Sequence, residues 1–155
     1  MHQPEISIAP EDPRQPDVLR LIAVSDAYMQ ALYPAESNHL AEAEALAAPG
    51  TVFLVARRDS EALGSIAFRI LAPGHAEMKR LFVRAEARGG GLGRRLLAAL
   101  EDAARQRNIG RISLETGIRQ AEAIGLYRAA GYQECPPFGG YTADPLSLFM
   151  TKQLR

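Results

Sequence analysis

Four glycines fall within five residues, between two segments of regular sequence. They occur in Arg88-Gly89-Gly90-Gly91-Leu92-Gly93, after an apolar run that ends at Val83 and before an amphipathic run that begins at Leu92. A strand that leads through glycines into a helix presents backbone amides at the helix N-terminus, where the helix dipole favours an anion. Glycine suits this role because a Cβ would hold phosphate oxygens away from the amides. The loop therefore predicts a phosphate-binding site, with a simple tight turn as the alternative.

Two common phosphate-binding loops are excluded by their spacing. The dinucleotide-binding pattern G-x-G-x-x-G fails because its last position would fall on Arg94 or Leu96. The P-loop fails because the sequence contains no Gly-Lys-Ser or Gly-Lys-Thr. The pattern that remains is R-x-x-G-x-G, which starts at Arg88.

This pattern, with Leu81-Phe82-Val83 before it, resembles the acetyl-CoA loop of the Gcn5-related N-acetyltransferase (GNAT) family. Farther along, Gln120–Tyr127 followed by Ala129–Tyr132 resembles the family's N-x-x-A-x-x-L-Y-x-x-x-G-F signature, with Gln120 replacing the usual Asn and Tyr132 replacing the usual Phe. The resemblance covers roughly residues 51 to 153 and is more specific than either motif alone. It implies an acetyl-CoA-dependent N-acetyltransferase of the small, single-domain bacterial type.

The resemblance also implies which residues bind acetyl-CoA. Between Lys79 and Arg95 there are six basic residues and one acidic residue, a net charge of +5. Positive side chains at a helix N-terminus oppose the helix dipole by roughly a few tenths of a kcal/mol each, unless a bound anion compensates. The charge therefore favours a bound pyrophosphate over a merely solvated helix start. The implied cofactor-binding residues are Leu81, Phe82, Val83, Arg88, Gly89, Gly90, Gly91, Leu92, Gly93, Arg94, Gln120 and Tyr127.

Direct attack of an amine on the thioester, which the resemblance implies, makes four demands on a site. First, an amide must donate a hydrogen bond to the thioester oxygen as negative charge grows there. Second and third, the attacking amine must be neutral, and a group must accept its proton. Fourth, the departing thiolate must be protonated. Backbone amides around Leu81 to Val83 would meet the first demand, because the family's sheet opens there and leaves strand donors unpaired.

Tyr127 occupies the position from which the family protonates the sulfur of coenzyme A. An unperturbed tyrosine pKa of about 10 lies above a thiol pKa of about 8.5, so the hydroxyl is protonated at neutral pH and can donate. The alternative is an aromatic side chain that packs on its own helix with Ile124. Within the matched motif, Tyr127 is predicted to be catalytic.

Two carboxylates compete for the role of base. Glu115 ends an apolar strand shortly before Gln120, where some family members, including the ribosomal-protein type, carry a glutamate. Glu77 begins the strand that leads to the glycine loop, where histone-type members carry theirs. The alternatives are ion pairs, of Glu115 with a loop arginine such as Arg119 and of Glu77, as an edge carboxylate, with Lys79. Glu77 and Glu115 are both predicted to be catalytic, and the sequence does not decide between them.

An ordinary glutamate is a weak base for this task. Its pKa of about 4.3 lies roughly six units below that of a lysine-like amine, a difference of about 8 kcal/mol, whereas an α-amine near 7.8 costs roughly 5 kcal/mol. The reaction therefore requires a buried glutamate with a raised pKa, a water relay, or an acceptor with a less basic amine.

In this family the acceptor lies over the connection between the first two helices and over the final strands. The corresponding segments here are Tyr28–His39 and Pro136–Asp144. Glu36 suits a cationic amine and His39 a polar group, although residues 36–38 have the alternative role of a helix N-cap. The predicted acceptor-binding residues are Tyr33, Glu36, His39 and Tyr141.

Hydrophobic periodicity and turn residues predict the elements that position these groups. The expected order is β-α-α-β-β-β-α-β-α-β-β, a mixed α/β fold in which helices flank one sheet. By resemblance this is the acyl-CoA N-acyltransferase fold, with a central, mostly antiparallel, twisted sheet. Strands are expected near Glu5–Ala9, Thr51–Arg57, Ala62–Leu71, Glu77–Val83, Ile112–Glu115, Tyr132–Cys135 and Ser147–Lys152. Helices are expected from Asp17 to a stop at Pro34, over Leu40–Ala48, from Leu92 with Leu92, Leu96, Leu97, Leu100 and Ala104 on one face, and over Gln120–Ala130.

Length and composition set outer limits on the function. For 155 residues we expect one domain over residues 1–155. Eighteen basic and eighteen acidic residues give zero net charge, which argues against a nucleic-acid partner. One cysteine and three scattered histidines predict no metal site. The sequence shows neither a signal-like leader nor a long apolar run, which predicts a cytoplasmic protein that binds no membrane.

The combined prediction is an enzyme, an acyltransferase that moves the acetyl group of acetyl-CoA to a primary amine of a small, amino-acid-like molecule. Acetyl-CoA is the expected cosubstrate, and a small-molecule amine is the expected partner. The sequence does not decide whether the protein forms a homodimer. Two alternatives remain. One is acetylation of a protein N-terminus or lysine, and the other, from a different class, is an acyl-CoA-binding sensor without turnover.

Overall fold

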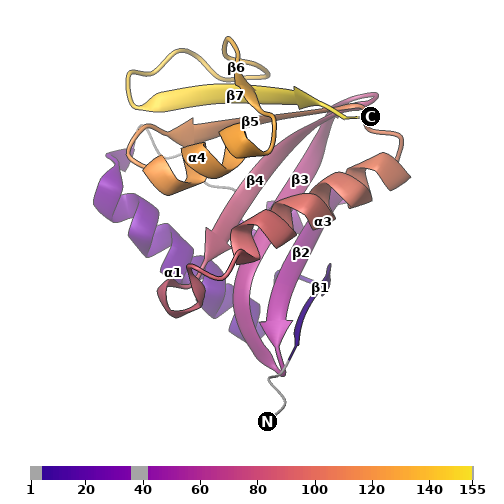
Figure 1. Cartoon of the computed structure of the whole chain (residues 1–155), viewed down its shortest axis with the longest axis vertical. Coiled ribbons are helices and arrows are strands. Elements are labelled where there is room, and N and C mark those ends of the chain that lie inside the picture. Colours follow the sequence, from indigo (N-terminus) through magenta and orange to yellow (C-terminus); the bar gives the residue numbers. More distant parts are fainter. Residues whose placement is uncertain (1–4, 36–41, 155) are drawn as a thin grey trace.

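The computed structural model describes residues 5–35 and 42–154. Across these residues seven strands form one sheet in the order β1-β2-β3-β4-β5-β7-β6. Helices α3 and α4 lie on one face of this sheet and α1 lies on the other (Figure 1). The predicted mixed α/β fold is confirmed. The strands are β1 Ile6–Pro10, β2 Thr51–Arg58, β3 Glu61–Ala72, β4 His75–Val83, β5 Arg111–Gly117, β6 Gln133–Glu134 and β7 Ser147–Gln153, and the helices are α1 Pro16–Leu32, α2 Ala43–Leu46, the short 3-10 helix η2 Ala85–Ala87, α3 Leu92–Gln106 and α4 Ala121–Ala129.

The sheet separates in its middle, between β4 and β5. Neighbouring strands are antiparallel except for these two, which are parallel and pair only over His75–Met78 and Arg111–Leu114. Beyond that point β4 continues along β3 as far as Val83, whereas β5 continues along β7 as far as Gly117 (Figure 1). Within the described chain, the facing edges of β4 and β5 therefore do not hydrogen-bond each other beyond Met78 and Leu114.

A bulge in β4 marks the point of separation. The register sets Arg80 and Leu81 opposite the single residue Ile66 of β3, and Arg80 is left-handed, with a φ of 61°. The Ser65 hydroxyl donates a hydrogen bond of 2.9 Å to the Arg80 carbonyl oxygen. The Arg80 guanidinium, which is almost fully buried, pairs with Asp26 of α1. Because a side chain at positive φ is strained, these two contacts fix a conformation that no sequence pattern predicts.

Helix α3 buries the face that its periodicity predicts. Its apolar side chains pack against β2, β3 and β4, and burial of each large one contributes roughly 1.5 to 3 kcal/mol. The buried apolar residues are Leu92, Leu96, Leu97, Leu100 and Ala104, as expected, and Glu101 is buried beside them. This packing fixes the N-terminus of α3, and with it the glycine loop, beside the gap in the sheet.

The second helix is shorter than predicted. Alanine and glutamate favour a helix over Leu40–Ala48, but α2 covers only Ala43–Leu46, because Glu42 is extended and the backbone turns toward β2 at Gly50. The start of the predicted range lies outside the described residues. The strand expected near Tyr132–Cys135 is also shorter, since it is reduced to Gln133–Glu134. Most other boundaries shift by one or two residues.

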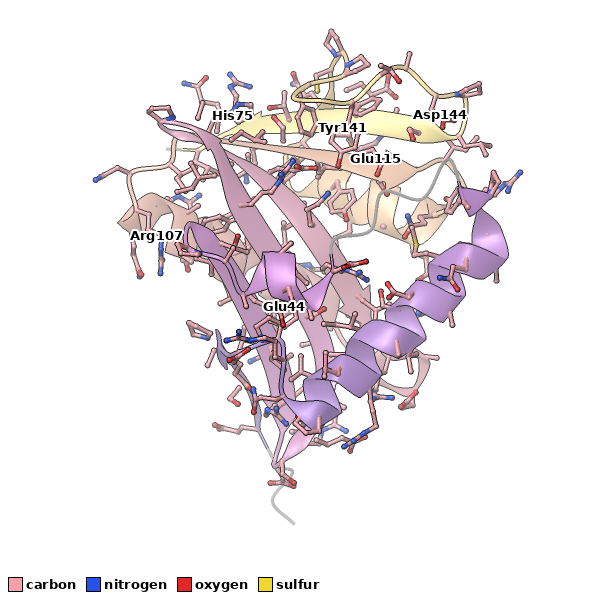
Figure 2. The ribbon with its side chains drawn as sticks, turned by 180° about the vertical axis from the view of Figure 1, so that it is seen from behind. Glu44, His75, Arg107, Glu115, Tyr141 and Asp144 are labelled. Atoms are coloured by element: carbon pink, nitrogen blue, oxygen red, sulfur yellow. The ribbon has the colours of Figure 1, made fainter. Side chains whose placement is uncertain are left out.

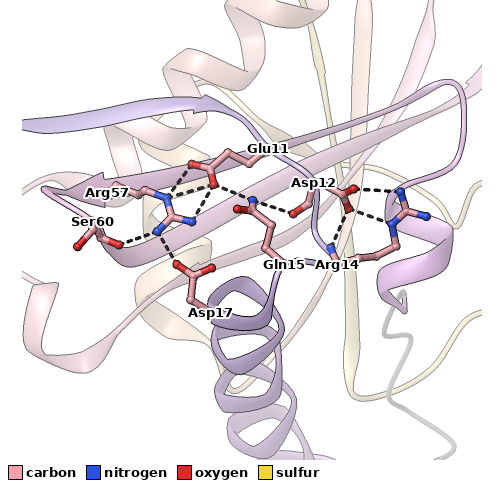
Figure 3. A network of polar contacts seen from close by, with 7 residues as sticks. All are labelled: Glu11, Asp12, Arg14, Gln15, Asp17, Arg57 and Ser60. Atoms are coloured by element: carbon pink, nitrogen blue, oxygen red, sulfur yellow. Dashed lines mark hydrogen bonds and ion pairs between the residues drawn. The ribbon is translucent and has the colours of Figure 1, made fainter.

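An ion network fastens the start of α1 to the end of β2 (Figure 3). Arg57 forms a bidentate pair with Glu11, with Nε–Oε2 at 2.9 Å and Nη2–Oε1 at 2.8 Å, and its Nη1 donates to Asp17 at 2.6 Å and to the Ser60 carbonyl at 2.7 Å. The hydrogen bonds from Arg57 lower the pKa of both Glu11 and Asp17. The network ties β2 to the chain segment that leads into α1.

Replacing Arg57 by glutamine is expected to lower Tm at pH 7 by roughly 4 to 8 °C, from a loss of about 2 kcal/mol. Carboxylates with a lowered pKa stabilise the fold above their ordinary pKa values near 4, and that stabilisation is lost as the pH falls through the lowered values. The difference in Tm between wild type and Arg57→Gln should therefore shrink below about pH 4. Thermal unfolding followed by circular dichroism at several pH values measures this.

The neighbouring Arg58 provides the control, because it is exposed on the same strand. Arg58→Gln should leave Tm nearly unchanged at every pH. A Tm difference for Arg57→Gln that stays constant down to pH 3 would contradict the ion-pair explanation.

Candidate active site

Two adjoining cavities lie in the gap between β4 and β5. One is a groove of about 400 Å³ along the glycine loop and the start of α4. The other, of about 80 Å³, lies deeper, between the two strands and α1. They share four wall residues, Tyr28, Leu81, Phe82 and Gln120. A long ligand can therefore lie in the groove with one end in the deeper cavity.

The glycine loop has the geometry that an anion site requires. Gly89 and Gly91 adopt left-handed conformations, with φ of 88° and 81°, that other residues rarely adopt. A Cβ on Gly89, Gly90 or Gly91 would meet no protein atom within 4 Å. Gly91 is the N-cap of α3 and carries no side chain to cap the first amides of the helix. The loop thus leaves space and backbone donors where a phosphate would sit.

The groove contains most of the predicted cofactor-binding residues. Gly90 and the exposed Arg94 do not line it, and Tyr127 lines the deeper cavity instead. Those that line it are Leu81, Phe82, Val83, Arg88, Gly89, Gly91, Leu92, Gly93 and Gln120. Further residues that were not predicted from the sequence also line the groove. They are Tyr28, Ala87, Arg119, Ala121, Glu122, Ala123 and Leu126.

The second motif could have indicated the missed residues on α4, which fall inside it. Tyr28 and Arg119 had no such signal, because they come from α1 and from the turn before α4.

The basic stretch is less concentrated on the groove than its net charge suggests. Lys79 and Arg80 pair with carboxylates, and Arg84 and Arg95 donate to the carbonyl oxygens of Ala62 and Ile6. Among the six basic residues of the stretch, Arg88 is the one that lines the groove. Its guanidinium lies over the rings of Tyr28 and Phe82, at 5.4 Å and 5.7 Å from their centroids. Fewer cations therefore lie beside the groove than the net charge of +5 between Lys79 and Arg95 suggests.

Tyr127 is buried on α4 and faces the deeper cavity. Burial raises the pKa of its hydroxyl, and the negative charge of Glu115 raises it further. Its ring packs edge-on against Tyr132, with centroids 6.0 Å apart. Tyr127 is thus a core residue that also presents a firmly protonated hydroxyl to the gap.

Glu115 lies on β5, one residue past the last residue paired with β4. Its carboxylate is half-buried, accepts a 2.6 Å hydrogen bond from the Ser147 hydroxyl and lines the same cavity as Tyr127. The alternative role considered for Glu115, an ion pair with Arg119, is not found among the described residues. Arg119 instead donates to the Leu32 carbonyl and lies 5.8 Å from the centroid of the Tyr33 ring.

Glu77 lies deeper in the sheet than expected, only 1% exposed rather than at an edge. It does pair with Lys79, at 3.1 Å, and also with Arg69 at 2.8 Å, and it accepts a short hydrogen bond from the Tyr141 hydroxyl. Burial raises the pKa of Glu77, but the Tyr141 hydrogen bond and the charge of Lys79 outweigh burial, so that its pKa lies below the ordinary value. Both carboxylate oxygens are therefore engaged by donors.

The predicted acceptor residues separate into three groups. Tyr33 lines the deeper cavity but is buried. Its hydroxyl oxygen accepts a hydrogen bond of 3.0 Å from the backbone amide of Arg119. A Cβ on Gly117 would lie 1.9 Å from that hydroxyl, so the close approach of Tyr33 to β5 requires glycine there. Tyr141 contacts Glu77 rather than lining the cavity directly. Glu36, His39 and the alternative helix cap at residues 36–38 lie outside the described residues.

Residues 5–35 and 42–154 contain no group of three or more His, Cys, Asp or Glu placed to bind a metal ion. In the same part of the chain, none of the helices has both the length and the apolar character needed to cross a membrane.

A sheet that separates beside a glycine-lined helix N-terminus is the fold of the acyl-CoA N-acyltransferases. A solved structure of a candidate acyl-CoA N-acyltransferase from Klebsiella pneumoniae subsp. pneumoniae MGH 78578 has this fold, with a TM-score of 0.83 and 37% sequence identity. The match covers 97% of this chain and 98% of that one. The chain belongs to the acetyltransferase (GNAT) family, whose model matches residues 19–132.

Two further similarities bear on function. A relative named IAA acetyltransferase, from Azospirillum brasilense, is 49% identical over 152 residues, which are 97% of this chain and 99% of that protein. The solved PaiA N-acetyltransferase from Thermoplasma acidophilum, in complex with coenzyme A, has the same fold, with a TM-score of 0.73 at 21% identity over 96% of this chain and 99% of that one.

Proposed function

We propose that this chain, as one N-acetyltransferase domain over residues 1–155, transfers the acetyl group of acetyl-CoA to a primary amine of a small, amino-acid-like molecule. The observation that carries the proposal is the separation of β4 and β5. It sets the glycine-lined groove end to end with a cavity that contains Glu115 and Tyr127. Membership of the GNAT family supports the same activity.

The groove fits acetyl-CoA, which when bound supplies an activated acetyl group as its thioester. The open space above Gly89–Gly91 and the uncapped start of α3 suit the pyrophosphate. The β4 edge past Met78, which has lost its β5 partner within the described chain, offers amides to the thioester oxygen. Leu81, Phe82 and Tyr28, shared by both cavities, would line the path between these two ends.

Glu115 is the better base of the two glutamates. The pKa of Glu77 is lowered, so removal of a proton from a lysine-like amine by Glu77 would cost more than the about 8 kcal/mol of an ordinary glutamate. Donors engage both oxygens of Glu77, whereas Glu115 faces the cavity. In this proposal Glu115 takes the amine proton, directly or through a water, and the Ser147 hydroxyl orients its carboxylate.

Tyr127 protonates the departing thiolate. Its raised pKa keeps the hydroxyl protonated, and Tyr127 lines the cavity into which the inner end of the groove leads. After transfer the tyrosinate is a strong base beside Glu115, and it recovers a proton from solvent through the cavity.

The size of the deeper cavity favours a small acceptor. About 80 Å³ holds the reacting end of a small molecule, and the side chains of α1 border it. The name of the 49% identical relative makes IAA one compound to test. A peptide N-terminus or a lysine side chain is the alternative acceptor.

One assay separates these possibilities. Release of free thiol from acetyl-CoA is measured with a panel of amines, amino acids, short peptides and IAA, and each product is identified by mass spectrometry. The proposal expects acetylation of small amines with a higher kcat/KM than of any peptide. Turnover with peptides alone would favour the protein acetyltransferase, and binding of acetyl-CoA without release by any compound would favour the sensor.

Gly90 does not itself line the groove, but its amide belongs to the loop proposed to hold the pyrophosphate. Replacing Gly90 by alanine should weaken acetyl-CoA binding about tenfold without lowering Tm, because the added Cβ would hold a phosphate oxygen away from the loop amides and one lost charge-assisted hydrogen bond costs roughly 1.5 kcal/mol. Gly90 has no positive φ, and its Cβ would touch no protein atom, so the fold should tolerate the change. Isothermal titration calorimetry with acetyl-CoA measures the affinity.

Gly110→Ala is the matched control, since Gly110 also has no positive φ and an open Cβ direction but lies after α3, away from the groove. An unchanged Kd for Gly90→Ala would place the pyrophosphate elsewhere.

A further inference from the structure

Tyr33 lines the deeper cavity, and it is in direct contact with Arg119, which lines the groove. We propose that Tyr33 limits the size of the acceptor and that Arg119 is the positioning residue that holds Tyr33 in place. This inference rests on the proposed function, because it concerns the amine that Glu115 deprotonates. The acceptor would accordingly be a compact primary amine.

Tyr33 covers the position next to Glu115 on one face of β5. Side chains two residues apart on a strand point to the same face and lie roughly 6 to 7 Å apart. Leu114 packs in the core with α3, so Glu115 and Gly117 point to the opposite face. Figure 2 looks onto that face, which α1 covers, and shows Glu115 there. Because a Cβ on Gly117 would lie 1.9 Å from the Tyr33 hydroxyl, that hydroxyl is the neighbour of an amine that faces Glu115.

Toward the start of β5 the same face is closed. Its next position is Ser113, which is buried and whose hydroxyl shares hydrogen bonds of 2.7 Å and 2.9 Å with a histidine and a threonine side chain. The residue that pairs with Ser113 on β4 is Glu77, which is also buried. Along β5, the room for the rest of an acceptor therefore lies toward the end of the strand, where Tyr33 bounds it.

Three contacts from one arginine hold Tyr33 and the end of α1. The Arg119 amide donates to the Tyr33 hydroxyl at 3.0 Å, and its guanidinium lies 5.8 Å from the centroid of the ring. The guanidinium also donates to the Leu32 carbonyl. Since the last turn of α1 contains no basic residue, Arg119 supplies the positive charge that a helix C-terminus favours.

The backbone of Tyr33 is fixed as well, because its amide donates to the Met29 carbonyl at 3.0 Å. The side chain is therefore tied at its ring, at its hydroxyl and at its backbone, and the residue is only 5% exposed. The ring can move aside for a larger acceptor only if these contacts break. A cavity wall that is held in this way discriminates by size.

The test measures how kcat/KM depends on acceptor size in two series of primary amines. One series runs from ethylamine to octylamine, in which the basicity hardly changes, and the other from glycine to phenylalanine. Wild-type kcat/KM should fall as the acceptor grows beyond a limit. Tyr33→Leu should raise kcat/KM for acceptors beyond that limit about tenfold relative to the smallest substrate, because each methylene that a pocket excludes changes kcat/KM by roughly tenfold or more.

Variants of Arg119 test the positioning role. Arg119→Met keeps the backbone amide but loses the contacts with Leu32 and with the Tyr33 ring, so it should raise the same ratio about threefold. Arg119→Lys should lie closer to wild type, because lysine again brings a cation to the Leu32 carbonyl. If Tyr33→Leu fails to fold, Arg119→Met, altered at an exposed side chain, still decides.

Arg128→Met is the matched control. Arg128 is an exposed arginine on α4 that pairs with Glu134 and lines neither the groove nor the deeper cavity. Its replacement should leave the ratio unchanged. A general loss of folded protein lowers kcat/KM for all acceptors alike, so it cannot produce the relative gain for larger acceptors.

Three results would overturn the size limit. They are wild-type kcat/KM that does not fall with acceptor size, a ratio that stays unchanged in both Tyr33→Leu and Arg119→Met, and turnover of neither series. An unchanged ratio in Arg119→Met alone would overturn only the role of Arg119. In each of these cases acetylation of another small amine still supports the proposed function, whereas absence of thiol release with every compound would overturn the proposed function together with the size limit.

Discussion

Replacing Glu115 by glutamine is expected to lower kcat/KM for the acceptor at pH 7 by about a hundredfold to a thousandfold, with the Kd of acetyl-CoA unchanged. Glutamine keeps the size of the side chain and can still accept the Ser147 hydrogen bond, so the cavity should keep its shape. The variant loses the capacity to take a proton from the amine. Steady-state kinetics with acceptor concentration varied, together with calorimetric titration of acetyl-CoA, measure both quantities.

The pH profile distinguishes the two glutamates. With Glu115 as the base, kcat/KM of the wild type falls on the acid side as Glu115 becomes protonated, and this limb disappears in Glu115→Gln. Glu77→Gln should keep the acid limb, because both oxygens of Glu77 are already engaged by donors. If the limb is lost in Glu77→Gln and kept in Glu115→Gln, the assignment is reversed. If both variants keep it, neither glutamate is the base.

Replacing Tyr127 by phenylalanine is expected to lower kcat about a hundredfold and to change the Kd of acetyl-CoA by less than about twofold. The ring still fills its place in the core, so the loss comes from the missing proton donor. Because the pKa of Tyr127 lies above its ordinary value near 10, wild-type kcat should not decline through tyrosine ionisation below about pH 10. Single-turnover kinetics at several pH values, which exclude product release, give the relevant rate.

Tyr132→Phe is the matched control for Tyr127→Phe. It also removes a buried hydroxyl, one that donates to Glu101 at 3.0 Å, but it leaves the cavity lining intact. This variant should lower Tm because Glu101 loses a partner, and it should leave kcat within about threefold of wild type. If the two variants lower kcat equally, Tyr127 is a packing residue and not the proton donor.

Local sequence signals predicted much of the fold and half of the site. The apolar face of α3 and the glycines before it are encoded within a few residues of each other, and both were found where expected. The gap in the sheet was expected from the family resemblance but was not predictable from residue spacing, because it depends on where the β4–β5 pairing stops and on a bulge at Arg80 that Ser65 and Asp26 hold from distant segments.

The choice between the glutamates depends on residues that are far apart in the chain. Arg69 and Lys79 flank Glu77 in sequence, but the Tyr141 hydroxyl that completes its pairing lies more than sixty residues away. Glu115 likewise finds Ser147 rather than the nearby Arg119. The sequence alone left the two carboxylates equal because the groups that set their pKa and orientation come from distant elements.

The central claim, that the gap between β4 and β5 is the acetyl-transfer site, is tested most directly by a crystal structure of the protein with acetyl-CoA. The account predicts the pyrophosphate on the backbone amides of Gly89–Gly93, the thioester oxygen on an amide of the separated β4 edge, and the sulfur in hydrogen-bond contact with the Tyr127 hydroxyl. Acetyl-CoA bound outside the gap, or with its sulfur remote from both Tyr127 and Glu115, would contradict it.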